Sequence, residues 1–479
     1  FRHALMRDAA YETQVLDVRR QTHADVAASI LARGGEPALV AEHLDRAGDA
    51  ESAAGQYLVA AQAEQARGAH AEAAKLLSRG IELFEGMPDS DSRDLGELTA
   101  RMLRAFSVSS VQGYGAPEVV TDHRRAEHLA ARLGNRQEVL PSLIAMWAYW
   151  FAAGDLSTAR TLLDRLAEMV QQEAHAWFQP EVESCAGFQA LYEGDLSRAR
   201  RHLEVAMAGF DARPPEQLVS PFWPLPNDPV AVSAVALATV GAVRGEPETV
   251  DHWEDVAVRR AQEVGFPRGP FSLAFVKTYA AWNRRFLGDV RGAQAMGADI
   301  VAIGMEYGYA YWMLMGSSYV GTATPGEEPQ RAYLEQNVAT LRMMGQEGFS
   351  ASHLALLARM AADDDDLDRA ADLVSDAFDV VRKSGEYLHL PEVLRLRGEV
   401  VLARFGDAEE AAADYAEALR VAIEQGARVS RLRAALALAA LPPSTRPADW
   451  RESLAAARAD LPARLANNET SDADALLAE

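Results

Sequence analysis

The phrase "GDLSTAR" at residues 154–160 returns as "GDLSRAR" at residues 194–200, forty residues further along the chain. Looser copies, in which a small residue stands five positions after Gly or Asp, occupy residues 48–53, 68–73, 288–293, 365–370 and 406–411. Degenerate copies begin at residues 115, 245 and 326. From residue 68 onward, the copies follow one another at steps near forty residues. A regular step of this length predicts a stacked array of structural repeats.

Each part of the phrase has a physical role in a turn between two helices. Gly adopts the left-handed conformation at low cost and ends the first helix, and the following Asp or Ser caps the second. The small residue, and in many copies another one seven positions later, lie on one face of the second helix and allow close packing. We assign this packing role to Gly154, Ala159, Gly194, Ala199, Ala206, Gly288, Ala293, Gly406, Ala411 and Ala418.

A single helical hairpin cannot bury its apolar face alone, so neighbouring hairpins must stack into a solenoid. The phrase resembles the tetratricopeptide repeat, whose second helix opens G-[DN]-x-x-x-A and carries another Ala seven residues later. The step near forty exceeds the usual repeat of about 34 residues. It resembles that of the sensor arms of bacterial signalling ATPases, which have longer helices. We expect an all-α, right-handed α-solenoid of roughly ten tetratricopeptide-like hairpins over residues 36–441.

Residues 1–35 differ from the repeats and read as a junction of two helices. The segment "FRHALMRDAAYE" at residues 1–12 resembles the phrase that closes the winged-helix region of STAND-type ATPases. The segments at residues 37–49 and 392–441 resemble the same group. This resemblance implies a sensor and protein-interaction arm that regulates an upstream ATPase domain. The parent protein would carry a linked class III nucleotide cyclase or, alternatively, a LuxR-type DNA-binding domain. A stand-alone scaffold for protein assembly is the alternative of another class.

Composition narrows the function classes. The net charge of −23 disfavours nucleic-acid and anionic-membrane partners, and no apolar run reaches the roughly 18 residues of a membrane span. Cys185 is the single cysteine, so an intrachain disulfide is impossible and a cytoplasmic location is expected. The chain begins with Phe1 rather than Met, which we interpret as a piece of a longer protein.

Catalytic and metal-binding motifs are missing from the sequence. None of the three lysines follows a glycine, so there is no Walker A motif, and H-E-x-x-H is also lacking. The acidic run at residues 363–374 fits a helix start better than a calcium loop, and Cys185 fits a small core residue better than a reactive thiol. We therefore expect a non-catalytic chain without cofactor or metal.

Two regions are candidates for contact with a partner. The aromatic segments at residues 146–151 and 307–319 either fill gaps between helices or line a concave groove for a protein, a peptide or a small ligand. In the groove interpretation, the contact residues are Trp147, Trp150, Tyr309, Tyr311 and Trp312, with Arg284 and Arg285. These arginines pair either with a carboxylate ligand or with surface carboxylates.

The second candidate region is the loop at residues 210–229, which contains six prolines and interrupts the array. It either contacts a partner through Phe222 and Trp223 or serves as a packed spacer. At the far end, Pro442 and Pro443 stop the array. We expect residues 442–479 to form a capping helix, at residues 447–465, followed by a frayed tail.

Overall fold

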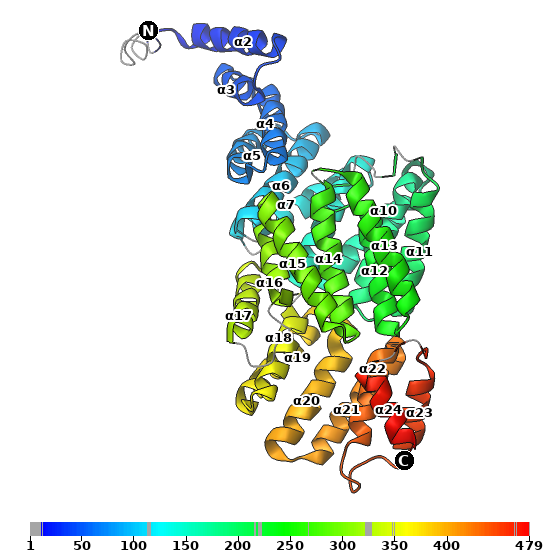
Figure 1. Cartoon of the computed structure of the whole chain (residues 1–479). Helices are drawn as coiled ribbons and strands as arrows, with labels where there is room; N and C mark the ends of the chain where they lie inside the picture. Colours follow the sequence, from blue (N-terminus) through cyan, green and yellow to red (C-terminus); the bar gives the residue numbers. More distant parts are fainter. Residues whose placement is uncertain are drawn as a thin grey trace. The chain divides into compact units, whose positions relative to one another are not determined.

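The computed structural model consists of α-helices joined by turns, and the described residues contain no β-strand (Figure 1). The structure describes residues 11–478 except 12, 113–115, 215–216, 219–222, 267, 321–327, 347, 349, 464 and 466, and it leaves out the side chains of residues 110 and 328–330. The all-α helical-repeat class expected from the sequence is confirmed. The chain forms two compact units, residues 1–145 and residues 146–479.

The first unit is a run of helices in which each packs against the next along the chain. Its helices are α2 (Leu16–Ala32), α3 (Pro37–Ala47), α4 (Ala50–Ala66), α5 (His70–Glu85), α6 (Asp91–Gln112) and α7 (Pro117–Leu133). The short η1 (Gln137–Val139) then leads into α8 (Leu140–Ala153), within which the boundary between the units falls. Of the two helices expected in residues 1–35, the structure describes α2; the other, and the phrase at residues 1–12 apart from Tyr11, lie outside the described residues.

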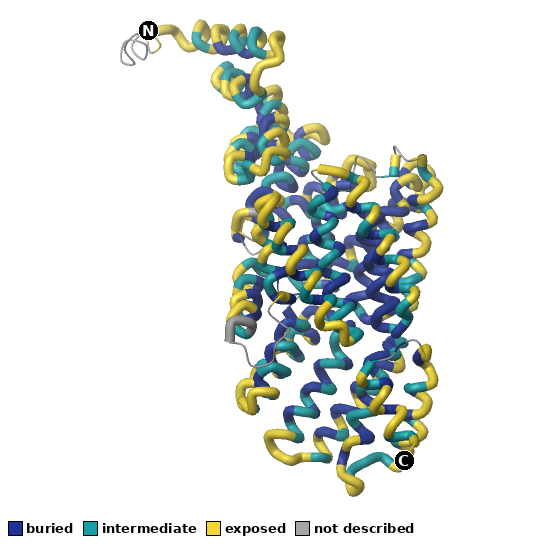
Figure 2. Tube along the Cα trace, in the orientation of Figure 1, coloured by how far each residue is buried: buried dark blue, intermediate teal, exposed yellow. Residues whose placement is uncertain are grey.

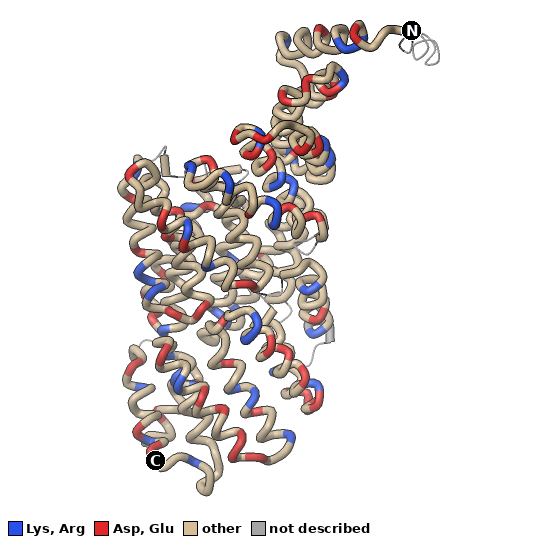
Figure 3. Tube along the Cα trace, turned by 180° about the vertical axis from the view of Figure 1, so that it is seen from behind, with Lys and Arg blue, Asp and Glu red and all other residues tan. Residues whose placement is uncertain are grey.

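A buried ion network joins α6 to α7 inside the first unit. Glu97, which has no exposed surface, accepts hydrogen bonds from the Nε atoms of Arg101 and Arg125, both at 2.8 Å. Asp122 is equally buried and accepts from Arg101 at 2.9 Å and from Arg104 at 2.8 Å. Removing one partner from such a network destabilises the fold, because the other charge is then left buried and unpaired. Elsewhere, charges of both signs are interspersed along the helices (Figure 3).

Within the described residues, the second unit continues as helical hairpins and ends with the C-terminal helices. They are α9 (Leu156–Val170), η2 (Glu173–Phe178), α10 (Gln179–Tyr192), α11 (Leu196–Asp211), α12 (Pro229–Arg244), α13 (Pro247–Val264), α14 (Arg268–Phe286), α15 (Val290–Tyr307), α16 (Ala310–Val320), α17 (Glu328–Met343), α18 (Ser350–Asp363), α19 (Leu367–Ser384), η5 (Tyr387–His389), α20 (Leu390–Phe405), α21 (Ala408–Gln425), α22 (Arg428–Ala439), α23 (Trp450–Ala459) and α24 (Asn468–Ala478). Helix α12 is buried on every side from Pro229 to Val243 (Figure 2).

The repeated phrase forms the turn inside those hairpins whose turns lie within the described residues. Its glycines have a positive φ: 82° at Gly154, 79° at Gly194, 93° at Gly288 and 67° at Gly406. The Asp that follows caps the second helix; Asp155, for example, accepts a hydrogen bond from the amide of Thr158 at 2.9 Å. The small residues assigned to close packing have no exposed surface: Ala159, Ala199, Ala206, Ala293, Ala411 and Ala418. Local sequence therefore sets both the turn and the packing distance of each hairpin.

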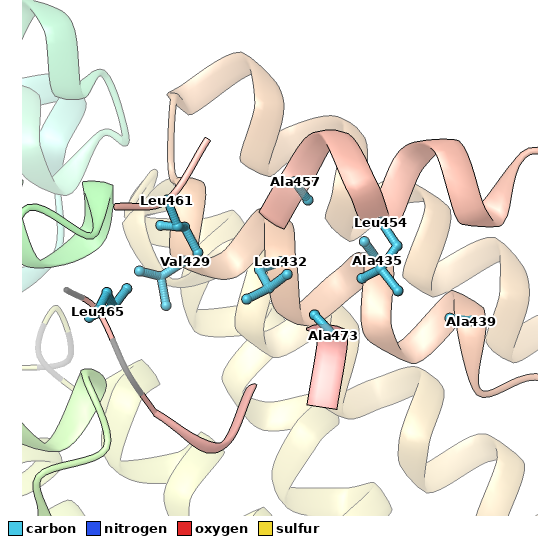
Figure 4. Close-up of a cluster of buried hydrophobic side chains, with 9 residues drawn as sticks. All are labelled: Val429, Leu432, Ala435, Ala439, Leu454, Ala457, Leu461, Leu465 and Ala473. Carbon is cyan, nitrogen blue, oxygen red and sulfur yellow. The ribbon is translucent and has the colours of Figure 1, made fainter. Parts of the chain in front are cut away.

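The C-terminal region differs from the expected single capping helix and frayed tail. It forms two helices, α23 and α24, that pack on α22. Ala473 of α24 is fully buried in one cluster with Leu432, Leu454 and Ala457 (Figure 4). Asn467 caps α24, because its Oδ1 accepts a hydrogen bond from the amide of Thr470 at 3.0 Å. A polar segment thus becomes helical because it has a cap and one apolar face to bury.

The early half of the second unit, residues 146–307, contacts its late half, residues 348–478, through the turn glycines. A Cβ atom added to Gly154 would lie 3.1 Å from the amide nitrogen of Gly348. At Gly194 it would lie 2.5 Å from Nε2 of Gln425, and at Gly245 it would overlap Leu461. These turns therefore need glycine for two reasons: the positive φ and the close approach of a later hairpin. Figure 1 shows the late helices α20 and α22 next to the ends of α12 and α14.

Candidate ligand-binding cavity

A cavity of about 210 Å³ lies between the two halves of the second unit. Residues of α12, α14, α16, α18, α20, α22 and η5 line it, and each of these α-helices is the first helix of its hairpin. The apolar part of the wall consists of Val243, Trp282, Phe286, Tyr319, Ala355, Leu356, Leu388, Val393 and Leu396. The polar part consists of Arg285, Ser318, Ser352, His353, Arg359, His389, Glu392, Arg395 and Arg433.

Three of the four arginines in this wall have carboxylate partners. Arg359 pairs with Glu399. Arg395 pairs with Glu399 and, at 3.1 Å, with Glu392. Arg433 lies 3.0 Å from Glu469 and 3.5 Å from Glu392. Arg433 also crosses between the halves, since it donates a hydrogen bond to the carbonyl oxygen of Phe286 at 2.5 Å.

Arg285 is the exception, because no described carboxylate forms an ion pair with it. Its neighbour Arg284 has two partners, Glu254 at 3.1 Å and Asp289 at 3.7 Å. Consecutive residues of an α-helix point about 100° apart, so Arg284 faces α13 while Arg285 faces the cavity. Burial lowers the pKa of Arg285, as expected for a guanidinium without a counter-charge. Four arginines and three paired carboxylates leave this cavity with an excess positive charge.

The protonation states of Glu392 and His389 fix the charge of the cavity at neutral pH, and the excess positive charge remains. Burial raises the pKa of Glu392, but Arg395 and Arg433 outweigh it and bring the pKa to about 2, so this carboxylate stays ionised. Burial, reinforced by His353, lowers the pKa of His389 to about 4, so the His389 ring is neutral. The His389 ring packs edge-on against Trp282, with ring centroids 5.8 Å apart.

The residues proposed for a partner groove do not assemble into one groove. Trp147 and Trp312 are each only 5% exposed, which corrects their assignment to a groove. Trp147 donates a hydrogen bond to Oε1 of Gln189 at 2.8 Å. Trp312 packs edge-on against Phe271 and Phe275 in the core between α14 and α16. The physical reason is that stacked helices leave gaps which large aromatic side chains fill.

The remaining groove candidates have separate surroundings. Trp150 of α8 is half-buried and packs edge-on against Tyr149, with ring centroids 4.9 Å apart. Tyr309 and Tyr311 are half-buried around the same core as Trp312. Of the seven candidates, Arg285 is the one that lines the cavity. No sequence signal distinguished Arg359, Arg395 and Arg433 from the many other arginines, because their meeting depends on contact between distant hairpins.

In the proline-rich loop, Phe222 lies outside the described residues. Trp223 is 5% exposed, and its Nε1 donates a hydrogen bond to the carbonyl oxygen of Asn227 at 2.7 Å. This burial corrects the assignment of Trp223 to a partner contact and fits the packed-spacer interpretation. The loop itself is shorter than expected, because α11 continues to Asp211.

Burial and geometry also limit the chemistry open to the remaining candidates. Cys185 is buried, and burial raises its pKa well above the ordinary value, so it is a protonated thiol. Among the described residues, no group of three His, Cys, Asp or Glu side chains has metal-binding geometry. None of the described helices is long and apolar enough to cross a membrane. A second hollow of about 200 Å³ lies between α19 and α20, but its Arg397 is paired with Asp414 at 2.9 Å.

Comparison with known proteins extends the description of the fold. The chain matches no family model. Its solved neighbours are helical-repeat proteins, among them a Rap protein complexed with competence and sporulation factor, with a TM-score of 0.53, 11% identity and coverage of 78% of this chain and 99% of that one. The fold is a tetratricopeptide-like α-solenoid. A STAND protein with a tetratricopeptide sensor from Pyrococcus horikoshii aligns with a TM-score of 0.35, 13% identity and coverage of 81% and 52%.

One curated relative is similar in sequence over nearly the whole solenoid. It is an uncharacterized protein of Rhizobium meliloti (strain 1021), which is 20% identical over 445 residues. The match covers 91% of this chain and 42% of the relative, so the chain spans less than half the length of that protein.

Proposed function

We propose that this tetratricopeptide-like solenoid is the ligand-sensing and protein-interaction arm of a multidomain bacterial signalling protein. The arm itself is non-catalytic and acts in the cytoplasm, where it regulates an upstream ATPase domain and a linked nucleotide cyclase. A LuxR-type transcriptional regulator is the alternative parent. The relative of more than twice the matched length supports a multidomain parent.

The observation that carries this proposal is the cavity built from both halves of the second unit. Trp282 and Arg285 come from the early half, whereas His353, Arg395 and Arg433 come from the late half. A ligand in this cavity contacts both halves at once. It therefore stabilises the arrangement in which they are in contact, by an amount that grows with ligand concentration above its Kd.

Ligand binding affects the rest of the protein through the contact between the halves. A change in the population of that contact alters the surface that the arm presents to a partner, either a protein or peptide or the ATPase domain of the same polypeptide. The coupling is reciprocal, so a partner that prefers one arrangement changes the ligand affinity by the same factor.

The test uses the complete reading frame that encodes this chain. We expect Gly194→Ala, which disturbs the contact between the halves, to change the rate of nucleotide hydrolysis by the full-length protein several-fold. Gly406→Ala is the matched control, since it has the same turn conformation and nothing within 4 Å of the added Cβ. The purified chain alone should hydrolyse no nucleotide. Turnover by the chain alone, or equal rates for both variants and the unaltered protein, would refute the proposal.

A further inference from the structure

The guanidinium of Arg285, which pairs with no described carboxylate, is costly to the isolated protein. An arginine held in partly buried surroundings without a counter-charge loses hydration and gains little in return. The side chains around it, Trp282, Phe286 and Tyr319, would accommodate an apolar residue at this position without such a loss. A destabilising charge in an otherwise well-paired cavity is typical of a binding site.

The cavity supplies two kinds of surface for one small molecule. Arg285 offers charged donors in a planar fork that fits a carboxylate or a phosphate. The hydroxyl of Ser352 also lines the cavity, and no described residue is hydrogen-bonded to it. The second kind of surface is apolar. It consists of the stacked rings of Trp282 and Phe286, whose centroids are 4.9 Å apart and whose planes form an angle of 13°. Leu356 continues this apolar wall.

The size of the cavity limits the ligand. A cavity of about 150 Å³ holds benzene, so about 210 Å³ accommodates one ring or a short aliphatic chain with a single anionic group. This volume does not enclose a whole polypeptide or nucleic acid. The excess positive charge and the volume of the cavity together indicate that its ligand is a small organic anion.

We propose that the cavity binds a small organic anion whose carboxylate or phosphate pairs with Arg285 and whose apolar body packs on Trp282 and Phe286. This inference rests on the proposed sensor function and names the chemical class of its ligand. The ligand supplies the counter-charge that no described carboxylate provides, and it contacts residues of both halves.

The experiment measures binding and thermal stability of the full chain with benzoate, phenyl phosphate and the neutral analogue benzamide. We expect one or both anions to bind and to raise the Tm, with benzamide at least tenfold weaker. The stronger of the two anions identifies the head group as a carboxylate or a phosphate. Failure of both anions to bind the unaltered chain would overturn the inference.

Arg285→Met and Arg284→Met form a matched pair of neighbouring variants. Arg285→Met should weaken anion binding at least tenfold and leave the Tm of the ligand-free chain equal or higher. Arg284→Met should keep anion binding but lower the Tm, because Glu254 loses its charged partner. A lower Tm for Arg285→Met with unchanged anion binding would assign Arg285 a purely structural role. This outcome would leave the nucleotide-hydrolysis test of the sensor function unaffected.

Discussion

At the scale of single residues, two glutamates near the start of α20, the buried Glu386 and the half-buried Glu392, have pKa values shifted in opposite directions. Glu386 has no exposed surface, and its two carboxylate oxygens have no hydrogen-bond partner among the described residues. Burial raises the pKa of Glu386 well above its ordinary value. For Glu392, burial also raises the pKa, but the charges of Arg395 and Arg433 outweigh it and bring the pKa to about 2.

The raised pKa of Glu386 predicts a stability that falls with increasing pH. The folded protein keeps this proton over a range in which the unfolded chain has lost it, so the contribution is complete below the unfolded pKa and decreases above it. Each pKa unit of elevation corresponds to about 1.4 kcal/mol. We expect Glu386→Gln to match the unaltered chain near pH 4 and to be more stable at pH 7.5, as measured by thermal unfolding at both pH values.

Glu392→Gln is the matched control for this pH dependence. Its lowered pKa stabilises the fold above the unfolded pKa, and that contribution disappears as the pH falls toward 2. The Gln variant of Glu392 should therefore be less stable than the unaltered chain at pH 7.5. If Glu386→Gln were also less stable at pH 7.5, the carboxyl of Glu386 would have a partner and our interpretation of its environment would be rejected.

At the scale of elements, the sequence was sufficient to predict the hairpin turns, because each is determined by a few adjacent residues. Asp195 caps α11 by accepting a hydrogen bond from the amide of Arg198 at 3.0 Å. Asp195→Ala should destabilise the start of α11 by about 1 kcal/mol. Hydrogen exchange of the first-turn amides measures this, with Ser197→Ala as the exposed control. Equal exchange in the two variants would show that the cap contributes nothing.

The elements that sequence reasoning described poorly are those whose structure depends on distant contacts. The polar tail at residues 467–478 was expected to be frayed, yet burial of Ala473 in the cluster around Leu432 stabilises α24. Trp147 and Trp312 were open to two interpretations, because an apolar helix face looks the same whether it meets a neighbouring hairpin or a partner. Tertiary packing decides such cases, and it is not encoded in any short segment.

At the scale of the whole molecule, the arrangement of the hairpins within the second unit brings distant residues into contact, such as Arg433 and Phe286, which are 147 positions apart. The rotation between neighbouring hairpins accumulates along a solenoid, and small changes in each step determine which late hairpin meets which early turn. For this reason the sequence predicted the solenoid but not the cavity: Arg285 was identified as a candidate, whereas its neighbours Arg395 and Arg433 were not. The cavity exists because the late half contacts the early half.

This contact can be tested with two turns of identical chemistry. Gly194 and Gly406 both end a helix with a φ near 70–80°, 79° and 67°, and both precede an Asp. Alanine at either position suffers the strain of the left-handed conformation, about 1–2 kcal/mol. At Gly194 alone, the new Cβ also lies 2.5 Å from Nε2 of Gln425, which donates a hydrogen bond to the carbonyl oxygen of Tyr387 at 2.6 Å.

We therefore expect Gly194→Ala to lower the Tm more than Gly406→Ala does, and to act at a distance. Hydrogen exchange in the Gly194 variant should increase around Tyr387 and at the end of α21, because the Gln425 side chain must move away from the early half. In the Gly406 variant, the increase should stay within the ends of α20 and α21 next to the turn. Equal exchange around Tyr387 in both variants would mean that the two halves do not contact each other in solution, and a cavity between them would then have no basis.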